Sequence, residues 1–254
     1  MTRTPGPPPG SCLLFPTCVL DALEPEVALA AARVLGRMGF EVGVSDDATC
    51  CGQPGWNAGH TEAAAKVARG TLQALAASSP RPIVVPAGSC ATMVKIFWGE
   101  LFHLHGTDRE RRQVSEVAAR TYEFAEFVAA RGGPSMIRAD PTPTVYHRSC
   151  HMLRELGIRD QPESLLDGTG ADRRFTSAED RCCGFGGLFS VKLPEVSVAM
   201  ADDVLDAMEA TQAARVVGCD ATCLIQLRSR AARRGSALEF RHLAQVLDEV
   251  SGNR

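Results

Sequence analysis

The sequence predicts an α/β protein made of two pseudo-symmetric copies of a small cysteine-rich unit, each with a parallel sheet. Three observations support this prediction. Four cysteines recur in the same order and at nearly the same intervals in the two halves of the chain. Short apolar segments alternate with helix-like segments, which is the order of elements in parallel α/β sheets. Each repeated cysteine also follows a predicted strand, and functional groups gather at the carboxyl ends of parallel strands.

The internal repeat relates residues that lie 132 positions apart, such as Cys18 and Cys150. In each half, the first cysteine precedes an adjacent Cys-Cys-Gly by 32 positions. A fourth cysteine follows that pair after 39 positions in the first half and 40 in the second. Chance is a poor explanation for two such triplets with matched distances on both sides. The repeated residues are Cys18, Cys50, Cys51 and Cys90 in the first half, and Cys150, Cys182, Cys183 and Cys223 in the second.

In the first half, apolar runs end shortly before the cysteines, as expected of buried strands that lead into loops. Between them lie segments rich in alanine and leucine, which favour helix. The expected elements are strands over residues 12–16, 40–44 and 83–85, and helices over residues 25–38 and 61–77.

In the second half, we expect strands over residues 144–147 and 215–217, a helix over 194–211, and another helix that begins near Cys223. Pro194 suits the first turn of its helix.

The segment over residues 103–143 is expected to join the two copies. Its arginines near residue 110 suggest a solvated helix, and residues 122–130 suggest an amphipathic one, before glycines and prolines break the pattern. The predicted organisation is a disordered tail over residues 1–11, a first unit with its linker helices over 12–138, and a second unit over 139–254.

Composition excludes several classes of function. Apolar residues make up 45% of the chain and charged residues 22%, which suffices for a buried core. The net charge is −3 and no basic stripe is present, so nucleic acid is not expected as a partner. No apolar run is long enough for a transmembrane helix, and the first residues lack the apolar region of a signal peptide. We therefore expect a cytoplasmic protein.

The ten cysteines point to metal chemistry. In a reducing compartment, clustered cysteines more often bind metal or do redox work than form disulfides. Neighbouring cysteines in a chain do not easily bond to each other, but both can face one metal cluster. Thiolates favour zinc and iron–sulfur clusters. The short knuckles of zinc ribbons and the close cysteine run of ferredoxins are both absent here.

The two remaining cysteines and three of the histidines carry expectations of their own. Cys12 has no counterpart in the repeat and is expected to be a small buried hydrophobe. Cys219 also has no counterpart, and could be either such a residue or a fifth ligand in the second copy. His147 and His151 flank Cys150 and could bind metal or carry protons, but we favour loop residues that form hydrogen bonds near the cluster. His242 is expected at the surface.

The arrangement of cysteines resembles that of a known family, the cysteine-rich CCG-domain proteins. That family includes the disulfide-cleaving subunit of heterodisulfide reductase and the iron–sulfur subunits of glycolate oxidase and of anaerobic glycerol-3-phosphate dehydrogenase. Its motif is a cysteine, a Cys-Cys-Gly, and a final Cys-x2-Cys. The segments CCGQPGWNAGH, VPAGSCATM, YEFAEFV, YHRSCHMLRELG and CCGFGGLFSVKLPEVSVAM carry a closer resemblance, to a component of three-part L-lactate oxidation systems.

The sequence departs from the wider motif at one position in each copy. Met93 and Gln226 stand where the last cysteine of Cys-x2-Cys is expected. In heterodisulfide reductase, five cysteines per domain support unusual clusters that cleave disulfides, whereas four thiolates suit an ordinary [4Fe-4S] cluster that passes electrons. The resemblance therefore implies two [4Fe-4S] clusters, held by the eight repeated cysteines.

The resemblance also implies an oxidoreductase subunit that transfers electrons during oxidation of L-lactate to pyruvate. Its implied partners are a ferredoxin-like iron–sulfur subunit and a third small subunit. The sequence has no complete Gly-x-Gly-x-x-Gly motif for a dinucleotide, so activity is expected only with these partners. Two alternative functions are a disulfide reductase of the heterodisulfide type and the iron–sulfur subunit of a glycolate or glycerol-3-phosphate dehydrogenase. A third is a structural protein with zinc in one copy, since four thiolates also satisfy tetrahedral zinc.

Overall fold

The computed structural model describes residues 10–78 and 80–252, and contains two four-stranded parallel sheets. The strand order is β2-β1-β3-β4 in the first sheet and β6-β5-β7-β8 in the second, so the two sheets have the same topology. This confirms the predicted fold of two related parallel α/β units. The strands are β1 (Ser11–Leu14), β2 (Glu41–Val44), β3 (Ile83–Val85), β4 (Thr121–Glu123), β5 (Pro143–His147), β6 (Asp172–Arg174), β7 (Arg215–Gly218) and β8 (Glu239–His242).

Helices follow the strands in both units. The first unit has α1 (Cys18–Leu23), α2 (Pro25–Arg37), α3 (Gln53–Asn57), α4 (Thr61–Ala77), α5 (Gly88–Thr92), a π-helical segment η1 (Met93–Phe97), α6 (Trp98–His105), α7 (Asp108–Ala119) and α8 (Phe124–Ala129). The second unit has α9 (Cys150–Arg154), α10 (Asp160–Gly168), α11 (Leu188–Lys192), α12 (Pro194–Glu209), α13 (Ala221–Arg234) and α14 (Leu243–Ser251).

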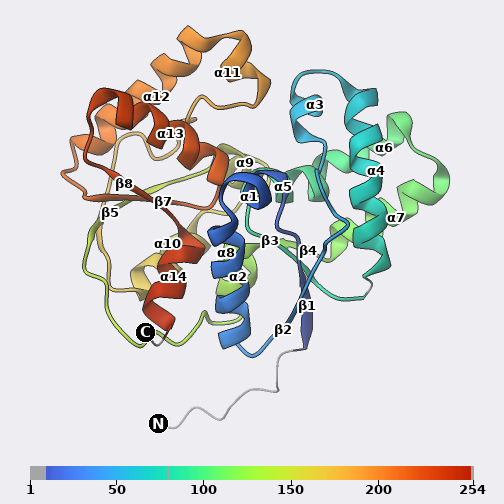
Figure 1. Cartoon of the computed structure of the whole chain (residues 1–254), viewed down its shortest axis with the longest axis horizontal. Coiled ribbons are helices and arrows are strands. Elements are labelled where there is room, and N and C mark those ends of the chain that lie inside the picture. The colour runs from blue at the N-terminus through green and yellow to red at the C-terminus, as the bar shows by residue number, and fades with distance from the viewer. Residues whose placement is uncertain (1–9, 79, 253–254) are drawn as a thin grey trace.

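The molecule is layered, with each sheet covered on both faces by helices (Figure 1). Helices α4, α6 and α7 cover the outer face of the first sheet, and α12 and α13 cover the outer face of the second. Neighbouring strand residues therefore point to opposite sides: Leu13 packs in the outer core of the first unit and Leu14 in the central core. Strands that are buried on both faces explain why these segments are continuously apolar.

The central layer joins the two units. Helices α2, α8, α10 and α14 lie between the sheets, with α2 beside α14 (Figure 1). The central core takes Leu35 and Phe127 from the first unit together with Tyr146 and Leu247 from the second. At the edge of this layer, the guanidinium of Arg37 forms an ion pair with Asp248 at 2.6 Å. Because this apolar layer belongs to both units, we expect them to fold as one cooperative body.

The segment expected to join the two copies packs largely on the first unit, and one of its elements differs from the prediction. Helix α7 packs on α4 and α6, and its Val114 and Val117 are buried. Tyr122, expected in a helix, lies in β4, which pairs with β3. The three-residue strand β4 was missed because it is too short to show the alternation of a strand, and it runs directly into α8.

Residues 1–9 lie outside the described part of the chain, so most of the predicted tail is not described, and β1 begins at Ser11. Among the described residues, no helix combines the length and apolar character needed to cross a membrane.

Candidate metal centre

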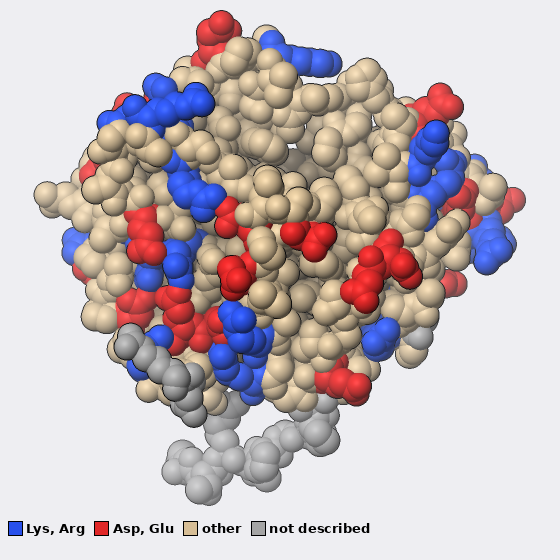
Figure 2. All heavy atoms as spheres, in the orientation of Figure 1, with Lys and Arg blue, Asp and Glu red and all other residues tan. Residues whose placement is uncertain are grey.

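All eight repeated cysteines line one cavity of about 290 Å³, which lies where the carboxyl ends of both sheets meet. The cavity opens between the two units, at the top of the molecule in Figure 2, and mostly uncharged residues surround its mouth. The thiols that line it are those of Cys18, Cys50, Cys51, Cys90, Cys150, Cys182, Cys183 and Cys223.

The fold places these cysteines by repeating one arrangement twice. Cys18 and Cys150 are the first residues of the helices that follow β1 and β5. Cys90 and Cys223 lie in the helices that follow β3 and β7. The adjacent pairs lie in the loops that follow β2 and β6. Since the carboxyl ends of parallel strands meet at one edge, residues distant in sequence converge there.

Within each unit, the four thiols form a chain of contacts. The Sγ atoms of Cys51 and Cys90 lie 3.3 Å apart, within hydrogen-bonding distance. Cys18 and Cys51 both donate to the sulfur of Cys50. In the second unit, Cys150 and Cys183 donate in the same way to Cys182, and Cys183 also contacts Cys223. These hydrogen bonds divide the eight thiols into two groups of four, one in each unit.

One cysteine in each group has a pKa that its neighbours lower, which favours its thiolate form. Hydrogen bonds from Cys18 and Cys51, together with the backbone N–H of Gly52, lower the pKa of Cys50 to about 3. The hydrogen bond that Cys18 donates, together with burial, raises its own pKa.

The second unit repeats this pattern. Hydrogen bonds from Cys150 and Cys183, and the N–H of Gly184, lower the pKa of Cys182 to about 2. Since the thiolate is the form that binds metal, each unit has one ligand already ionised and three nearby.

The glycine after each cysteine pair is required by the backbone. Gly52 has a φ of +86°, and a Cβ there would lie 2.7 Å from the carbonyl oxygen of Ala64. Gly184 has a φ of +82°, and its Cβ would lie 2.5 Å from the carbonyl oxygen of Ser197. A side chain would thus be strained by its φ and would collide with the next helix.

Backbone strain also occurs directly before the first cysteine. Thr17 is buried and has a φ of 68°, which is a rare conformation for a β-branched residue. Such strain costs on the order of 1–3 kcal/mol and tends to occur at functional sites. It turns the chain from β1 into α1, where Cys18 faces the cavity.

Hydrogen bonds and close packing fix the two halves of the site relative to each other. The backbone N–H of Ser89 in the first unit donates to Oδ2 of Asp220 in the second, at 2.7 Å. A Cβ on Gly88 would lie 2.2 Å from Cγ of Met152, so the backbone of one unit lies directly against a side chain of the other. The cavity is therefore a single preformed space shared by both units.

The environments of three histidines differ in part from those expected from the sequence. His151 lines the cavity, with its Nε2 3.4 Å from the amide nitrogen of Gln53 and its Nδ1 3.9 Å from Cys150 Sγ. His147, expected to form hydrogen bonds, is buried, and neither ring nitrogen has a partner among the described residues. Burial lowers the pKa of His147 to about 4, so its imidazole is neutral.

His242 was expected at the surface, and this prediction was wrong. It is buried at the start of α14, where its Nδ1 accepts a hydrogen bond from the N–H of Ala244. Histidine at a helix start has no strong sequence signature, which is why the burial was missed.

The two unrepeated cysteines lie outside the cavity lining. Cys12 and Cys219 are both buried in the central core between the sheets. The phenol of Tyr146 donates a hydrogen bond to the sulfur of Cys219 at 3.4 Å. Burial is the main cause that raises the pKa of both thiols, that of Cys12 to about 11.

This donor set fits sulfur-ligated metal. The cavity offers two groups of four thiols, one of which in each group is ionised, on backbone that glycine allows to turn tightly. Four thiolates bind a [4Fe-4S] cluster, and four thiolates also satisfy tetrahedral zinc. No carboxylate cluster of the kind that holds calcium or magnesium lies among the residues that line this cavity.

Comparison with known proteins identifies both units. The profile of the family described as "CCG: Cysteine-rich domain" matches residues 12–95 and 144–228. "Lactate utilization protein A" from Exiguobacterium sp. is 36% identical over 239 residues, which cover 93% of this chain and 96% of that protein. The protein of the same name from Bacillus cereus is 36% identical over 241 residues, which cover 94% and 98%. These matches confirm the resemblance inferred from the cysteine motifs.

One solved structure shares the fold. The crystal structure of a hypothetical protein from Helicobacter pylori superposes with a TM-score of 0.58 at 12% sequence identity. The superposition covers all of this chain but only 51% of that one, so the chain spans about half of the length of that protein. At this identity the likeness concerns the fold alone.

Proposed function

The chain belongs to the family of cysteine-rich CCG-domain proteins that includes the lactate utilization proteins A. From this premise we propose that it is an iron–sulfur electron-transfer subunit of a multi-component L-lactate oxidation system. One observation carries the proposal: the eight repeated cysteines, and neither of the two others, line one cavity in two groups of four. Packing alone would not require such convergence.

The proposed ligands follow the two groups. Cys18, Cys50, Cys51 and Cys90 hold one [4Fe-4S] cluster, and Cys150, Cys182, Cys183 and Cys223 hold the other. When bound, such clusters accept and donate single electrons. Cysteine binds metal as the thiolate, so Cys50 and Cys182, whose pKa values are lowered, would serve readily as ligands, and the neighbouring thiols would lose their protons on binding.

The residues around the cavity give the site its environment. The backbone N–H groups of Gly52 and Gly184 point at cysteine sulfur, with N–Sγ distances of 3.5 Å, and stabilise negative charge there. Hydrogen bonds to sulfur and limited access of water both set the reduction potential of a cluster. Because both groups line one cavity, an electron that enters at one cluster has a short path to the other.

Partner subunits are needed for the part of lactate oxidation that cysteine thiols cannot perform. The relatives are named for lactate utilization, and we propose that this chain passes electrons between a ferredoxin-like iron–sulfur subunit and a third small subunit. Removal of hydride from L-lactate requires an acceptor such as a flavin, which is the task of a partner subunit. The chain is thus an oxidoreductase subunit that works with partners in the cytoplasm.

The proposal is tested on protein purified without oxygen. Iron, sulfide and zinc are measured together with electron paramagnetic resonance after reduction. We expect about eight irons per chain, as two four-iron clusters require, and a reducible cluster signal. Lactate oxidation should then require this chain together with the partner subunits. Zinc without iron would contradict electron transfer and favour a structural role. Disulfide reduction by the chain alone would favour a heterodisulfide-reductase type of activity.

A further inference from the structure

The side chain of His147 has unmet bonding capacity in the interior of the protein. It ends β5, its residue is 2% exposed, and both ring nitrogens lack a hydrogen-bond partner within residues 10–78 and 80–252. A buried polar group without a partner costs about 1–3 kcal/mol. A neutral imidazole offers one N–H and one lone pair, so an electron-pair acceptor would remove part of this cost.

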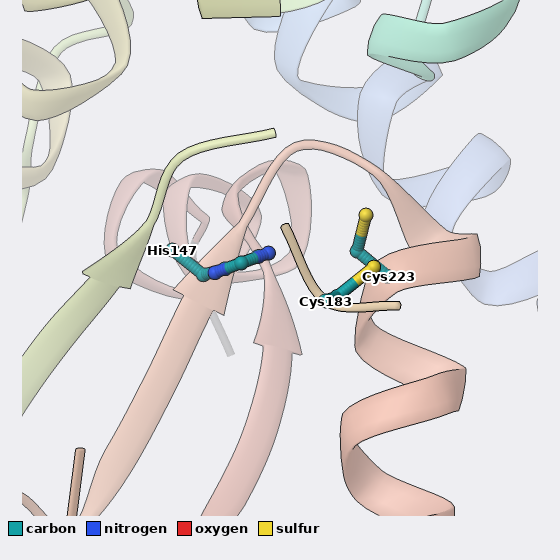
Figure 3. Close-up of side chains that lie close together, drawn as sticks. All are labelled: His147, Cys183 and Cys223. Atoms are coloured by element: carbon teal, nitrogen blue, oxygen red, sulfur yellow. The ribbon is translucent and has the colours of Figure 1, made fainter. Parts of the chain in front are cut away.

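The imidazole faces the second group of thiols. A ring nitrogen of His147 and the sulfurs of Cys183 and Cys223 all lie within 4.8 Å of one another. In Figure 3 the ring extends from the end of β5 toward these two side chains, which come from the loop after β6 and from the start of α13. Metal–nitrogen and metal–sulfur bonds are about 2.0–2.3 Å long, so one metal ion could bind all three atoms after small side-chain movements.

Among the described residues of the first unit, no such group of a histidine and two cysteines is present. Phe15 occupies the position that corresponds to His147, since it precedes Cys18 by three residues as His147 precedes Cys150. Phe15 is fully buried in the outer core of its unit. The two copies therefore share the thiols but differ at this position, where one has an apolar ring and the other a ring with metal-binding nitrogens.

We propose that His147 is a metal ligand in the second unit, so that the two sites of the chain have different donor sets. The first site would bind its metal cluster with thiolates alone, whereas the second would use the His147 imidazole together with Cys183 and Cys223. The inference rests on the proposed function, in that the metal is taken to be an iron of the second cluster. Four thiols and one imidazole face that site, which is one donor more than a four-iron cluster requires, so the imidazole would take the place of one thiolate in the ligand set proposed above.

A histidine ligand would make the two clusters unequal. Replacing a thiolate by a neutral imidazole removes one negative charge from the cluster, and histidine ligation raises the reduction potential of iron–sulfur centres. The second cluster would then have the higher potential, and electrons would pass from the first unit to the second.

The test uses full-length protein prepared without oxygen, reduced and examined by pulsed electron paramagnetic resonance. We expect one of the two clusters to show the hyperfine coupling of a directly bound imidazole nitrogen. Labelling of histidine with ¹⁵N should change this coupling from that of ¹⁴N to that of ¹⁵N. The variant His147→Phe, which copies the first unit, should lose this coupling and shift the potential of that cluster alone to a more negative value. The control His151→Phe alters the other nearby imidazole and should retain the coupling.

Two clusters without a strong histidine coupling would overturn the inference, and so would a coupling that persists in His147→Phe. If that variant does not fold, the labelled unmodified protein decides the question by itself. If the second unit holds zinc, X-ray absorption separates the two proposals. One nitrogen ligand at about 2.0–2.1 Å that is lost in His147→Phe would support the inference while removing iron from this site. A zinc ion with sulfur ligands alone would overturn it.

Discussion

The carboxylate of Asp220 and the backbone N–H of Ser89 form a hydrogen bond of 2.7 Å between the two units, at the rim of the cysteine cavity. Both residues are buried. Asp220 is also the N-cap of α13, where its Oδ1 accepts from the N–H of Thr222 at 3.1 Å. One side chain thus orients the helix that carries Cys223 and helix α5, which carries Cys90.

Substitution Asp220→Ala should destabilise the protein by about 2–4 kcal/mol. The change removes an N-cap, which contributes about 1 kcal/mol, and leaves the buried N–H of Ser89 without a partner, which costs about 1–3 kcal/mol. Denaturant unfolding under anaerobic, reducing conditions measures this difference. The control is Thr107→Ala, which removes the exposed N-cap of α7 within a single unit. Equal losses in the two variants would show that the contact between the units adds nothing.

Substitution Gly184→Ala should destabilise the protein by more than about 2 kcal/mol and reduce metal binding in the second unit. The new Cβ would lie 2.5 Å from the carbonyl oxygen of Ser197 at a φ of +82°, so the loop that carries Cys183 would have to move. Thermal unfolding and metal content measure the two effects.

Gly36→Ala is the matched control, because no atom lies within 4 Å of the position that a Cβ would take there in α2. Alanine favours helix over glycine by about 0.5–1 kcal/mol, so this variant should be unchanged or slightly more stable. A neutral effect of Gly184→Ala would contradict the close approach seen at this loop.

The fold could be predicted from sequence where burial leaves a strong pattern. The strands β1, β3, β5 and β7 are at the centre of the sheets, and their apolar runs were recognised. The edge strand β6 has the sequence Asp-Arg-Arg, which is polar and three residues long. Its pairing with β5 comes from the geometry of the unit and not from local preference, so no local signal predicts it.

The candidate site was predictable to a similar extent. Spacing identified the eight cysteines because a repeated pattern of one rare residue type is a strong signal. That both groups share one cavity was not predictable, because it depends on how the units pack through α2 and α14. The burial of His147 depends on the same tertiary packing. A comparison of His147 with Phe15 across the repeat is the sequence signal that could have indicated it.

Single cysteine substitutions should separate the two clusters. Cys50→Ser and Cys182→Ser each remove the thiolate at the centre of one group, so iron should fall from about eight to about four per chain in either variant. The control Cys219→Ala removes a buried thiol outside the cavity lining and should retain full iron content. Iron analysis on anaerobic protein measures the result. A comparable loss of iron in Cys219→Ala would make that residue a ligand as well.

The stability of the protein should depend on pH through Glu123, at the end of β4. Its side chain is fully buried, and its Oε2 accepts from the backbone N–H of Ala125 while its Oε1 has no partner among the described residues. Burial, with the nearby carboxylates of Glu126 and Asp220, raises its pKa from 4.5 to about 8. Between these values the folded protein holds a proton that the unfolded chain has released.

The contribution of Glu123 to stability is therefore full below pH 4.5 and is lost as pH rises through about 8, with a slope of at most about 1.4 kcal/mol per pH unit. Glu123→Gln removes this titration and keeps an oxygen for the N–H groups of α8, so its stability relative to the unmodified protein should rise steadily from pH 5 to pH 8. Denaturant unfolding at several pH values measures the difference. Glu110→Gln is the contrasting control, because a hydrogen bond from the backbone of Thr107 lowers the pKa of Glu110. Glu110→Gln should therefore destabilise the protein at neutral pH, and this destabilisation should disappear as pH falls through the lowered pKa of Glu110. Parallel pH profiles for Glu123→Gln and the unmodified protein would show that this buried carboxyl does not change its protonation on folding.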